Sequence, residues 1–209
     1  MNISDDDIKI VLLGDVGVGK TNLMNVFFKQ EFKNDPFSTT NPYCLQKEIK
    51  RGKNTYTYSI WDTAGQEKYR SITKQFIRDA KIILLVYAID NRKSFDDIGD
   101  WINFIKENKE EGKCLVALIA NKCDLMDEQK VSDEEGEEYA KKLGFEFLIT
   151  SALLSAESFR KFVIELINNY IHIIKQTETE TKKKSSGNIK INKKEEAKQN
   201  KKKKCCKNN

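Results

Sequence analysis

A glycine-rich segment with one lysine offers the clearest chemistry in this chain. Residues 14–21 read GDVGVGKT, which fits the phosphate-cradling pattern of glycine, four residues, glycine, lysine and serine or threonine. The backbone N–H groups of such a turn, and those of the helix that follows it, point toward one anion. In this interpretation Lys20 bridges the β- and γ-phosphates of a nucleotide, and the hydroxyl of Thr21 binds Mg²⁺. The segment alone fits an ATP-binding protein as well as a GTP-binding one.

A second segment, NKCD at residues 121–124, favours guanine as the base. It follows the apolar run at residues 115–120, and ligands bind at the carboxyl ends of such strands. The carboxylate of Asp124 can accept hydrogens from N1 and the exocyclic N2 of guanine, an arrangement that adenine does not offer. Asn121 can reach the edge of the base, and the stem of Lys122 can cover its face.

Two residues after another apolar run extend this base site. Ser151 and Ala152 follow residues 145–149, and there a backbone N–H group would reach O6 of guanine. A segment such as 121–124 is by itself often no more than a surface turn. In a chain that also carries the segment 14–21, a guanine nucleotide is the favoured ligand, and an ATP-using enzyme is the least favoured alternative because NKCD would then have no role.

A third segment, WDTAGQE at residues 61–67, supplies groups that hydrolysis at a phosphate needs. Asp62 is available to hold Mg²⁺ through water, and Gly65 can offer its backbone N–H to a γ-phosphate. Gln66 can orient an attacking water without being a strong base, which suits a loose, phosphate-centred transition state. The tripeptide AGQ alone carries no meaning, so this interpretation depends on the other two segments.

The elements that must position these segments are strands and helices in alternation. The candidate parallel strands lack polar alternation, as expected for strands covered on both faces, and are residues 8–13, 82–87, 115–120 and 145–149. Residues 55–61 alternate apolar and polar side chains, and residues 45–50 do so weakly; with a turn at 51–54 between them, they predict an antiparallel hairpin. We expect an α/β fold: a mostly parallel sheet with one antiparallel edge hairpin and helices on both faces.

Helix boundaries also have signals in the sequence. Ser94 is expected to cap a helix with one apolar face, formed by Ile98, Trp101, Ile102 and Ile105. Ser132 and Glu135 predict a capping box, and Gly144 is expected to end the helix that it starts.

The charge of the chain is divided unevenly between two predicted regions. The 209 residues carry a net charge of +5, yet residues 182–209 hold twelve Lys and two Glu, a balance of +10 that leaves about −5 for residues 1–181. After residue 175 the apolar periodicity ends, so we expect a domain at residues 1–175 and a disordered, lysine-rich tail at 176–209. A basic arm suggests an anionic partner, either nucleic acid or a membrane surface.

Composition excludes several classes of protein. The longest uncharged apolar run, residues 82–89, is far shorter than the roughly 20 residues of a membrane-spanning helix. The start MNISDDDIK has neither the basic residues of a secretory signal nor the glycine that myristoylation needs, so we expect neither. The five Cys form no paired framework, which indicates a reducing compartment.

In their order and spacing, GDVGVGKT, WDTAGQEKYRSI, NKCDL and TSA resemble the motifs of the Ras superfamily of small GTPases, most closely those of the Rab branch, over residues 8–174. The resemblance implies a P-loop NTPase G domain that binds GTP or GDP with Mg²⁺ and hydrolyses GTP, with Gln66 and Lys20 as catalytic residues. It adds Thr39 as a ligand of Mg²⁺ and Phe32 as an aromatic contact of guanine. The implied phosphate contacts are Asp15, Val16, Gly17, Val18, Gly19, Lys20, Thr21, Thr39 and Gly65.

The end of the chain resembles the double-cysteine endings of Rab proteins. Cys205 and Cys206 would each carry a geranylgeranyl group, and two lipid chains anchor a protein stably where one does not. The lysines before them would add attraction to anionic lipid. The alternatives are a nucleic-acid arm for the lysines and a chance or metal-binding pair for the cysteines. The resemblance implies a regulator of vesicle trafficking on the cytoplasmic face of an intracellular membrane, with a cytosolic pool.

The implied partners are those of a GTP-dependent switch: an exchange factor, a GTPase-activating protein, a dissociation inhibitor with an escort protein, effectors of the GTP state and an anionic membrane, but no nucleic acid. The effector surface would include Cys44, Trp61 and Phe76, where Cys44 replaces a usual Phe. Thr40 stands beside Thr39, so the assignment of the Mg²⁺ ligand rests on spacing.

One residue of the phosphate loop departs from the family pattern in a way that bears on the rate. Val16 takes a position that is usually Gly, Ser or Ala, and its branched side chain can crowd Gln66 and the attacking water. We therefore expect slow intrinsic hydrolysis. A GTP-binding scaffold that scarcely hydrolyses, and a Ras-like signalling GTPase, are the alternatives.

Overall fold

The computed structural model of the chain describes residues 7–32, 43–63, 70–109 and 114–176, without the side chains of residues 70–73. The chain divides into two units, residues 1–167 and residues 168–209. In the second unit, residues 168–176 are helical. In the described part of the chain, no helix has the length and apolar character needed to cross a membrane.

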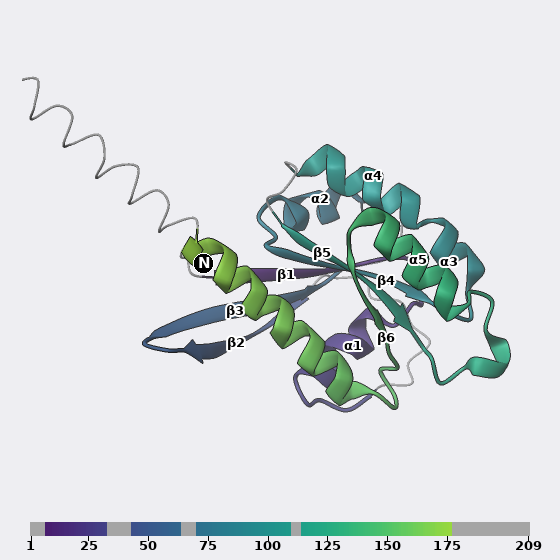
Figure 1. The fold of residues 1–209 in the computed structure, drawn as a ribbon, viewed down its shortest axis with the longest axis horizontal. Coiled ribbons are helices and arrows are strands. Elements are labelled where there is room, and N and C mark those ends of the chain that lie inside the picture. The colour runs from purple at the N-terminus through teal and green to yellow at the C-terminus, as the bar shows by residue number, and fades with distance from the viewer. Residues whose placement is uncertain (1–6, 33–42, 64–69, 110–113, 177–209) are drawn as a thin grey trace, which may run out of the picture. The chain divides into compact units, whose positions relative to one another are not determined.

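One sheet forms the centre of the first unit (Figure 1). In the described residues its order is β2-β3-β1-β4-β5-β6. Its strands are β1 (Asp7–Leu13), β2 (Tyr43–Arg51), β3 (Asn54–Asp62), β4 (Ile82–Ala88), β5 (Leu115–Asn121) and β6 (Glu146–Ile149). All pairings are parallel except that of β2 with β3. The predicted sheet, with one antiparallel hairpin at its edge, is confirmed.

The central strands form because their apolar runs are covered on both faces. Every residue of β4 is buried, and β1 is buried from Ile8 to its end. Val11 of β1 lies opposite Ile83 of β4 in the sheet, and both belong to the same buried cluster as Trp101. Burial of such side chains contributes roughly 1.5–3 kcal/mol each, so this cluster holds the strands that carry the site.

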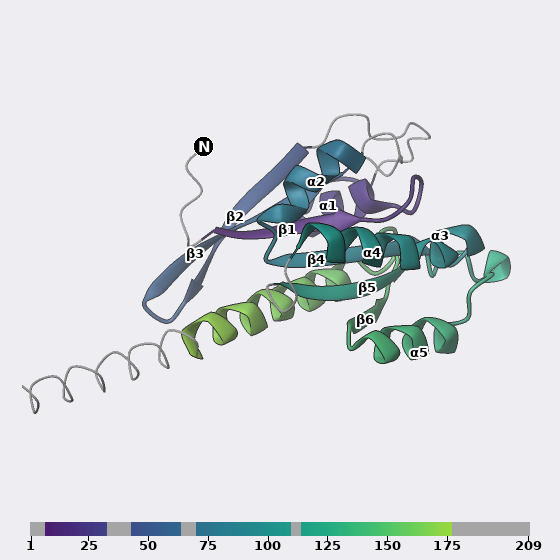
Figure 2. The same cartoon turned by 90° about the horizontal axis from the view of Figure 1, so that it is seen from above.

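Helices lie on both faces of the sheet, as predicted (Figure 2). The helices are α1 (Lys20–Phe27), α2 (Arg70–Arg78), α3 (Arg92–Asp96), α4 (Ile98–Asn108), the short 3₁₀ helix η2 (Met126–Glu128) and α5 (Asp133–Leu143), followed by a last helix that begins at residue 156. On one face Phe27 of α1 makes edge-to-face contacts with Tyr58 of β3 and with Phe159 of the last helix. Side chains of α2, α3, α4 and α5 pack in the cluster on the opposite face.

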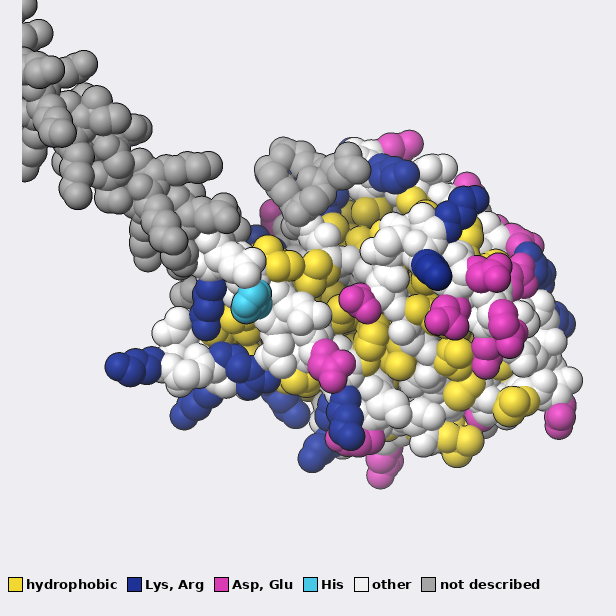
Figure 3. Space-filling view, in the orientation of Figure 1, with side chains coloured by type: hydrophobic (Ala, Val, Ile, Leu, Met, Phe, Trp, Pro, Cys, Tyr) yellow, Lys and Arg dark blue, Asp and Glu magenta, His cyan; other side chains and the backbone are white. Residues whose placement is uncertain are grey.

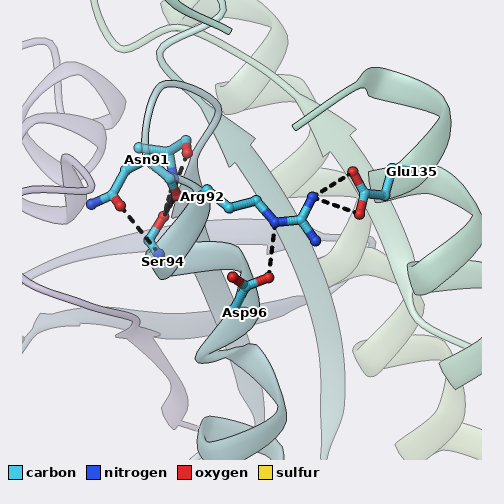
Figure 4. A network of polar contacts seen from close by, with 6 residues as sticks. Asn91, Arg92, Ser94, Asp96 and Glu135 are labelled. Carbon is cyan, nitrogen blue, oxygen red and sulfur yellow. Dashed lines mark hydrogen bonds and ion pairs between the residues drawn. The ribbon is translucent and has the colours of Figure 1, made fainter. Parts of the chain in front are cut away.

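The helix predicted to begin at Ser94 is divided into α3 and α4, and Ser94 lies inside α3. The side chain of Asn91, not that of Ser94, caps the helix by accepting a hydrogen bond from the backbone N of Ser94. The Ser94 hydroxyl instead donates to the carbonyl of Asn91 at 2.7 Å (Figure 4). Asp97 takes the N-cap position of α4, and its side chain makes no capping hydrogen bond. The expected apolar face of α4 is confirmed, since its four residues are buried.

Helix α5 begins after Ser132 and ends at Gly144, the two positions that the sequence predicted. The Ser132 hydroxyl accepts a hydrogen bond from the backbone N of Glu135, and Gly144 ends the helix with a positive φ of 69°. The Glu135 carboxylate contacts the Arg92 guanidinium at 2.8 Å, and Arg92 also contacts Asp96 at 2.9 Å (Figure 4). Only the Ser132 half of the predicted capping box is confirmed, since the Glu135 carboxylate pairs with Arg92 and links α5 to α3.

Candidate nucleotide-binding site

The motif segments meet at one edge of the sheet because the parallel strands end there. The segment 14–21 follows β1, Asp62 ends β3, residues 121–124 begin at the end of β5, and Ser151 follows β6. The carboxyl ends of these strands lie side by side in the sheet. This edge is where open α/β sheets bind ligands.

Two glycines of the phosphate loop have no alternative at their positions. A Cβ atom on Gly14, which has a φ of +136°, would lie 2.0 Å from the carbonyl oxygen of Val86. A Cβ atom on Gly19, with a φ of +96°, would lie 2.3 Å from Nδ2 of Asn121. The loop therefore approaches both β4 and the end of β5 more closely than any side chain allows.

Lys20 is held inside the curve of the same loop. Its ammonium donates to the carbonyl oxygens of Gly14 at 2.8 Å and Asp15 at 2.7 Å. Burial lowers the pKa of Lys20 from 10.5 to about 8, while Asp62 and Asp15 act in the opposite direction. The lysine thus remains mostly charged at neutral pH at a place where phosphate groups are expected.

Thr21 and Asp62 come together from the loop and the end of β3. The Thr21 hydroxyl donates to Oδ2 of Asp62 at 2.6 Å, and Asp62 is fully buried. A hydroxyl and a carboxylate are the hard oxygen donors that Mg²⁺ prefers, so these residues fit the ion. The next residue, Thr63, donates its hydroxyl to the Leu12 carbonyl at 2.7 Å and fixes the chain where it leaves β3. Sequence reasoning missed Thr63.

Asn121 connects the two halves of the site. Its Nδ2 donates to the carbonyl oxygen of Val18 in the phosphate loop at 2.8 Å. Its Oδ1 accepts from the backbone N of Ala152 at 3.2 Å. The side chain, buried to 1% exposure, thus joins the phosphate loop to the base segment. Its contact with the base edge stays a prediction.

Ser151 orients the carboxylate that is expected to select guanine. Its hydroxyl donates to Oδ1 of Asp124 and accepts from the backbone N groups of Leu153 and Leu154, both at 3.1 Å. This contact fixes the orientation of the Asp124 carboxylate, including that of its second oxygen, Oδ2. Neighbouring Lys122, in the left-handed region with a φ of 67°, is paired with Asp90 at 3.3 Å.

One contact of the phosphate loop was not predicted by any motif of the sequence. The indole Nε1 of Trp101 in α4 donates to Oδ1 of Asp15 at 2.8 Å. Burial raises the pKa of the Asp15 carboxyl, which this hydrogen bond opposes and neighbouring Asp97 reinforces. A buried tryptophan usually needs a partner for its N–H, and that need was the only available signal.

The residues of the expected effector surface lie together. Cys44 of β2 pairs across the hairpin with Trp61, whose ring lies 5.0 Å from the ring of Phe76 in α2. The buried ammonium of Lys9 lies 5.0 Å from the Trp61 ring and 5.4 Å from that of Phe76. Lys9, which sequence reasoning missed, supports the two aromatic rings from β1.

The remaining predicted residues are partly outside the described chain. Val16 and Phe32 are exposed, at 41% and 39%. Thr39, Gly65 and Gln66 lie outside the described residues, as do Thr40, Cys205 and Cys206. A Cβ atom on Gly17 would meet no atom within 4 Å, and Val18 is buried.

The profile of the Ras family matches residues 9–172. The chain is a Rab-type member of the Ras family of small GTPases. This GTPase is 42% identical over 148 residues to Ras-related protein Rab-8B of Homo sapiens, an alignment that covers 71% of each chain. It is 37% identical over 161 residues to Ras-related protein RGP2 of Oryza sativa subsp. japonica, covering 76% of this chain and 74% of the relative. It is 35% identical over 180 residues to Ras-related protein Rab11A of Lotus japonicus, covering 86% and 79%. The family, the α/β G domain and GTPase activity expected from the sequence are confirmed.

Proposed function

We propose that this GTPase is a membrane-anchored switch that regulates vesicle trafficking. Nucleotide and Mg²⁺ hold residues 33–46 and 63–75 in one arrangement, and hydrolysis of GTP releases them. The output is a change of binding partner. The regulators are an exchange factor, a GTPase-activating protein, a dissociation inhibitor and an escort protein.

The observation that carries this proposal is the double contact of Asn121 with Val18 and Ala152. It ties the loop expected to hold the phosphates to the segment expected to hold the base. The contact of Thr21 with Asp62 adds the hydroxyl and carboxylate expected at the metal. A nucleotide spanning these points would touch all three motifs at once.

In the proposed reaction each residue has a limited role. Lys20 holds the β- and γ-phosphates, with backbone N–H groups of residues 15–21 and Gly65 around them. Asp124, Lys122 and Phe32 hold the base, and Gln66 orients the attacking water. Mg²⁺, when bound by Thr21, Thr39 and Asp62, supplies charge neutralisation between the phosphates.

The proposed membrane anchor is the end of the chain. Geranylgeranyl groups on Cys205 and Cys206 would insert in the bilayer, and the twelve lysines of residues 182–209 would contact anionic headgroups. The domain at residues 1–175 would then work on the cytoplasmic face of an intracellular membrane, with a tail at 176–209.

The test is single-turnover hydrolysis of bound GTP with Mg²⁺, alone and with a panel of GTPase-activating proteins. We expect slow conversion to GDP that an activating protein accelerates and that Gln66→Leu abolishes. We also expect Val16→Ser to raise the intrinsic rate, because it removes the branched side chain near the water. Conversion that is equally fast in Gln66→Leu would refute the assigned mechanism.

A GTP-binding scaffold that signals by occupancy alone is the second candidate. It is favoured by one observation, the exposed branched side chain of Val16 on the phosphate loop. Persistence of GTP with every activating protein, restored to turnover by Val16→Ser, would select this candidate.

A further inference from the structure

The tip of the β2–β3 hairpin concentrates positive charge. Residues 43–56 carry four basic side chains against one acidic side chain, Glu48. Gly52, with a φ of +64°, takes the first central position of the two-residue turn, as in a type II′ hairpin. This tight turn brings Lys50, Arg51 and Lys53 together, and the two lysines are exposed. We call these three residues the basic hairpin tip.

The opposite edge of the sheet carries the opposite charge. Residues 127–138, which run from within η2 into the middle of α5, hold seven acidic residues and one lysine. Six of the seven are exposed, and the seventh, Glu135, is paired with Arg92. Figure 3 shows acidic side chains gathered over α5 and basic side chains gathered over the hairpin. The first unit is therefore electrically polarised along its sheet.

The two charged regions are far enough apart for an anionic surface to interact electrostatically with one and not with the other. Strand β2 forms one edge of the six-stranded order and β6, beside α5, forms the other. Five strand spacings place these edges roughly 24 Å apart. The Debye length at physiological ionic strength is only about 8 Å. An anionic surface at the hairpin therefore attracts the tip while the acidic edge is screened.

The direction of β3 separates the tip from the nucleotide site. Strand β3 starts at Asn54, beside the tip, and ends at Asp62, which contacts Thr21 of the phosphate loop. Nine residues of strand span about 27–30 Å. When a surface contacts the tip, the phosphate loop lies at the far end of β3. The nucleotide site therefore faces away from that surface and stays open to nucleotide and to regulators.

We propose that the basic hairpin tip is a membrane contact that orients the G domain on an anionic lipid surface. The proposal rests on the membrane anchoring proposed above and adds a second contact from within the folded domain. Single-stranded nucleic acid is the weaker fit, because it requires aromatic rings for stacking and the two tyrosines nearest the tip, Tyr56 and Tyr58, are buried. The charge on the tip instead suits the phosphates and carboxylates of lipid headgroups.

The experiment uses the full chain without lipid modification, loaded with GDP, and vesicles of phosphatidylcholine with or without phosphatidylserine. In one variant Lys50, Arg51 and Lys53 are changed to Gln. The matched control changes three exposed lysines of α4 and α5 to Gln, namely Lys106, Lys141 and Lys142. A third variant has Gln at residues 201–204. Bound GDP, GTP hydrolysis and thermal unfolding are measured on the same preparations, so a failed nucleotide switch or a misfolded variant is seen separately.

We expect the tip variant to lose roughly 10- to 100-fold in its partition to vesicles with phosphatidylserine. The control should change less than about twofold, because its charges lie beyond the screening distance. Equal losses in tip variant and control, or no loss in the tip variant, would overturn the proposal. If the tip variant loses binding as expected but the 201–204 variant loses none, the proposed tail anchor would be contradicted and the tip contact would stand.

A second measurement reads the orientation directly. A lipid with a photoactivatable headgroup is cross-linked to the wild-type chain on the same vesicles, and the modified peptides are identified by mass. We expect cross-links within residues 43–56 and none within 127–138. Cross-links that favour residues 127–138 would overturn the proposal. Binding of single-stranded nucleic acid through the tip, with no binding to the vesicles, would also overturn it.

Discussion

The indole Nε1 of Trp101 donates a hydrogen bond to Oδ1 of Asp15 at 2.8 Å, which joins α4 to the phosphate loop across 86 positions of sequence. Asp15 immediately precedes Val16, and its carbonyl oxygen accepts from Lys20. The packing of α4 on the sheet is therefore connected to the position of the loop that is expected to hold the phosphates.

Trp101→Phe should remove this bond while it keeps most of the buried ring. We expect the free energy of unfolding to fall by about 1–2 kcal/mol, because the half-buried carboxylate loses its donor. GDP should also leave faster. In an Asp15→Ala background the same change should cost clearly less, and a double-mutant cycle by urea unfolding measures the coupling. Additive losses would show that the bond contributes nothing beyond packing.

Asn121→Ala should loosen the site at its centre. The Val18 carbonyl and the Ala152 N–H would lose their partner together, which costs about 2–4 kcal/mol in stability and speeds the release of GDP. The control is Asn91→Ala, which removes an asparagine that caps α3 and should cost about 1 kcal/mol without altering nucleotide release. Fluorescent GDP dissociation and urea unfolding separate the two effects. Equal release rates for the two variants would contradict the assigned role of Asn121.

Two helical glycines should respond to alanine with opposite signs. A Cβ atom on Gly136 of α5 would lie 2.3 Å from Oη of Tyr87 and 2.8 Å from Cζ of Phe147. Gly136→Ala should therefore destabilise the fold by about 1–3 kcal/mol, with partial recovery when Tyr87→Phe is added. At Gly99 of α4 the nearest atom is 4.0 Å away, and Gly99→Ala should stabilise by about 0.5–1 kcal/mol. Thermal unfolding measures both, and a shift of the same sign in both variants would refute this account of the packing.

Nucleotide binding should weaken as the pH rises through about 8. The pKa of Lys20 is about 8 in this structure, and phosphate oxygens favour its charged form, so binding raises that pKa and takes up a proton. Linkage then predicts an affinity for GDP roughly fourfold lower at pH 8.5 than at pH 7. Lys20→Arg should bind more weakly but with little pH dependence, because Arg stays protonated. The same slope in both proteins, measured by calorimetry, would assign the titration to another group.

The fold could be predicted from the sequence where one physical cause dominates. The strand at residues 82–87 is an uninterrupted apolar run, and a strand covered on both faces buries such a run completely. The turn at Gly52 and the helix end at Gly144 followed from the positive φ that glycine accepts. The motif segments met at one edge because parallel strands share a direction.

The contacts that connect distant elements could not be predicted in the same way. The bond between Trp101 and Asp15, and the position of Lys9 under the rings of Trp61 and Phe76, depend on how helices and strands pack in three dimensions. The helix predicted to begin at Ser94 is divided into α3 and α4, with Asn91 capping α3 and Asp97 preceding α4. Such contacts and helix boundaries depend on tertiary packing, which local sequence patterns do not describe.

The central claim is that the bound nucleotide sets the arrangement of residues 33–46 and 63–75. The most direct test is amide hydrogen exchange of the full chain with Mg²⁺, loaded first with GDP and then with a GTP analogue that resists hydrolysis. We predict stronger protection of both segments with the analogue, while β4 and β5 exchange equally in the two forms. Identical exchange of both segments in the two forms would contradict the claim that this GTPase is a switch.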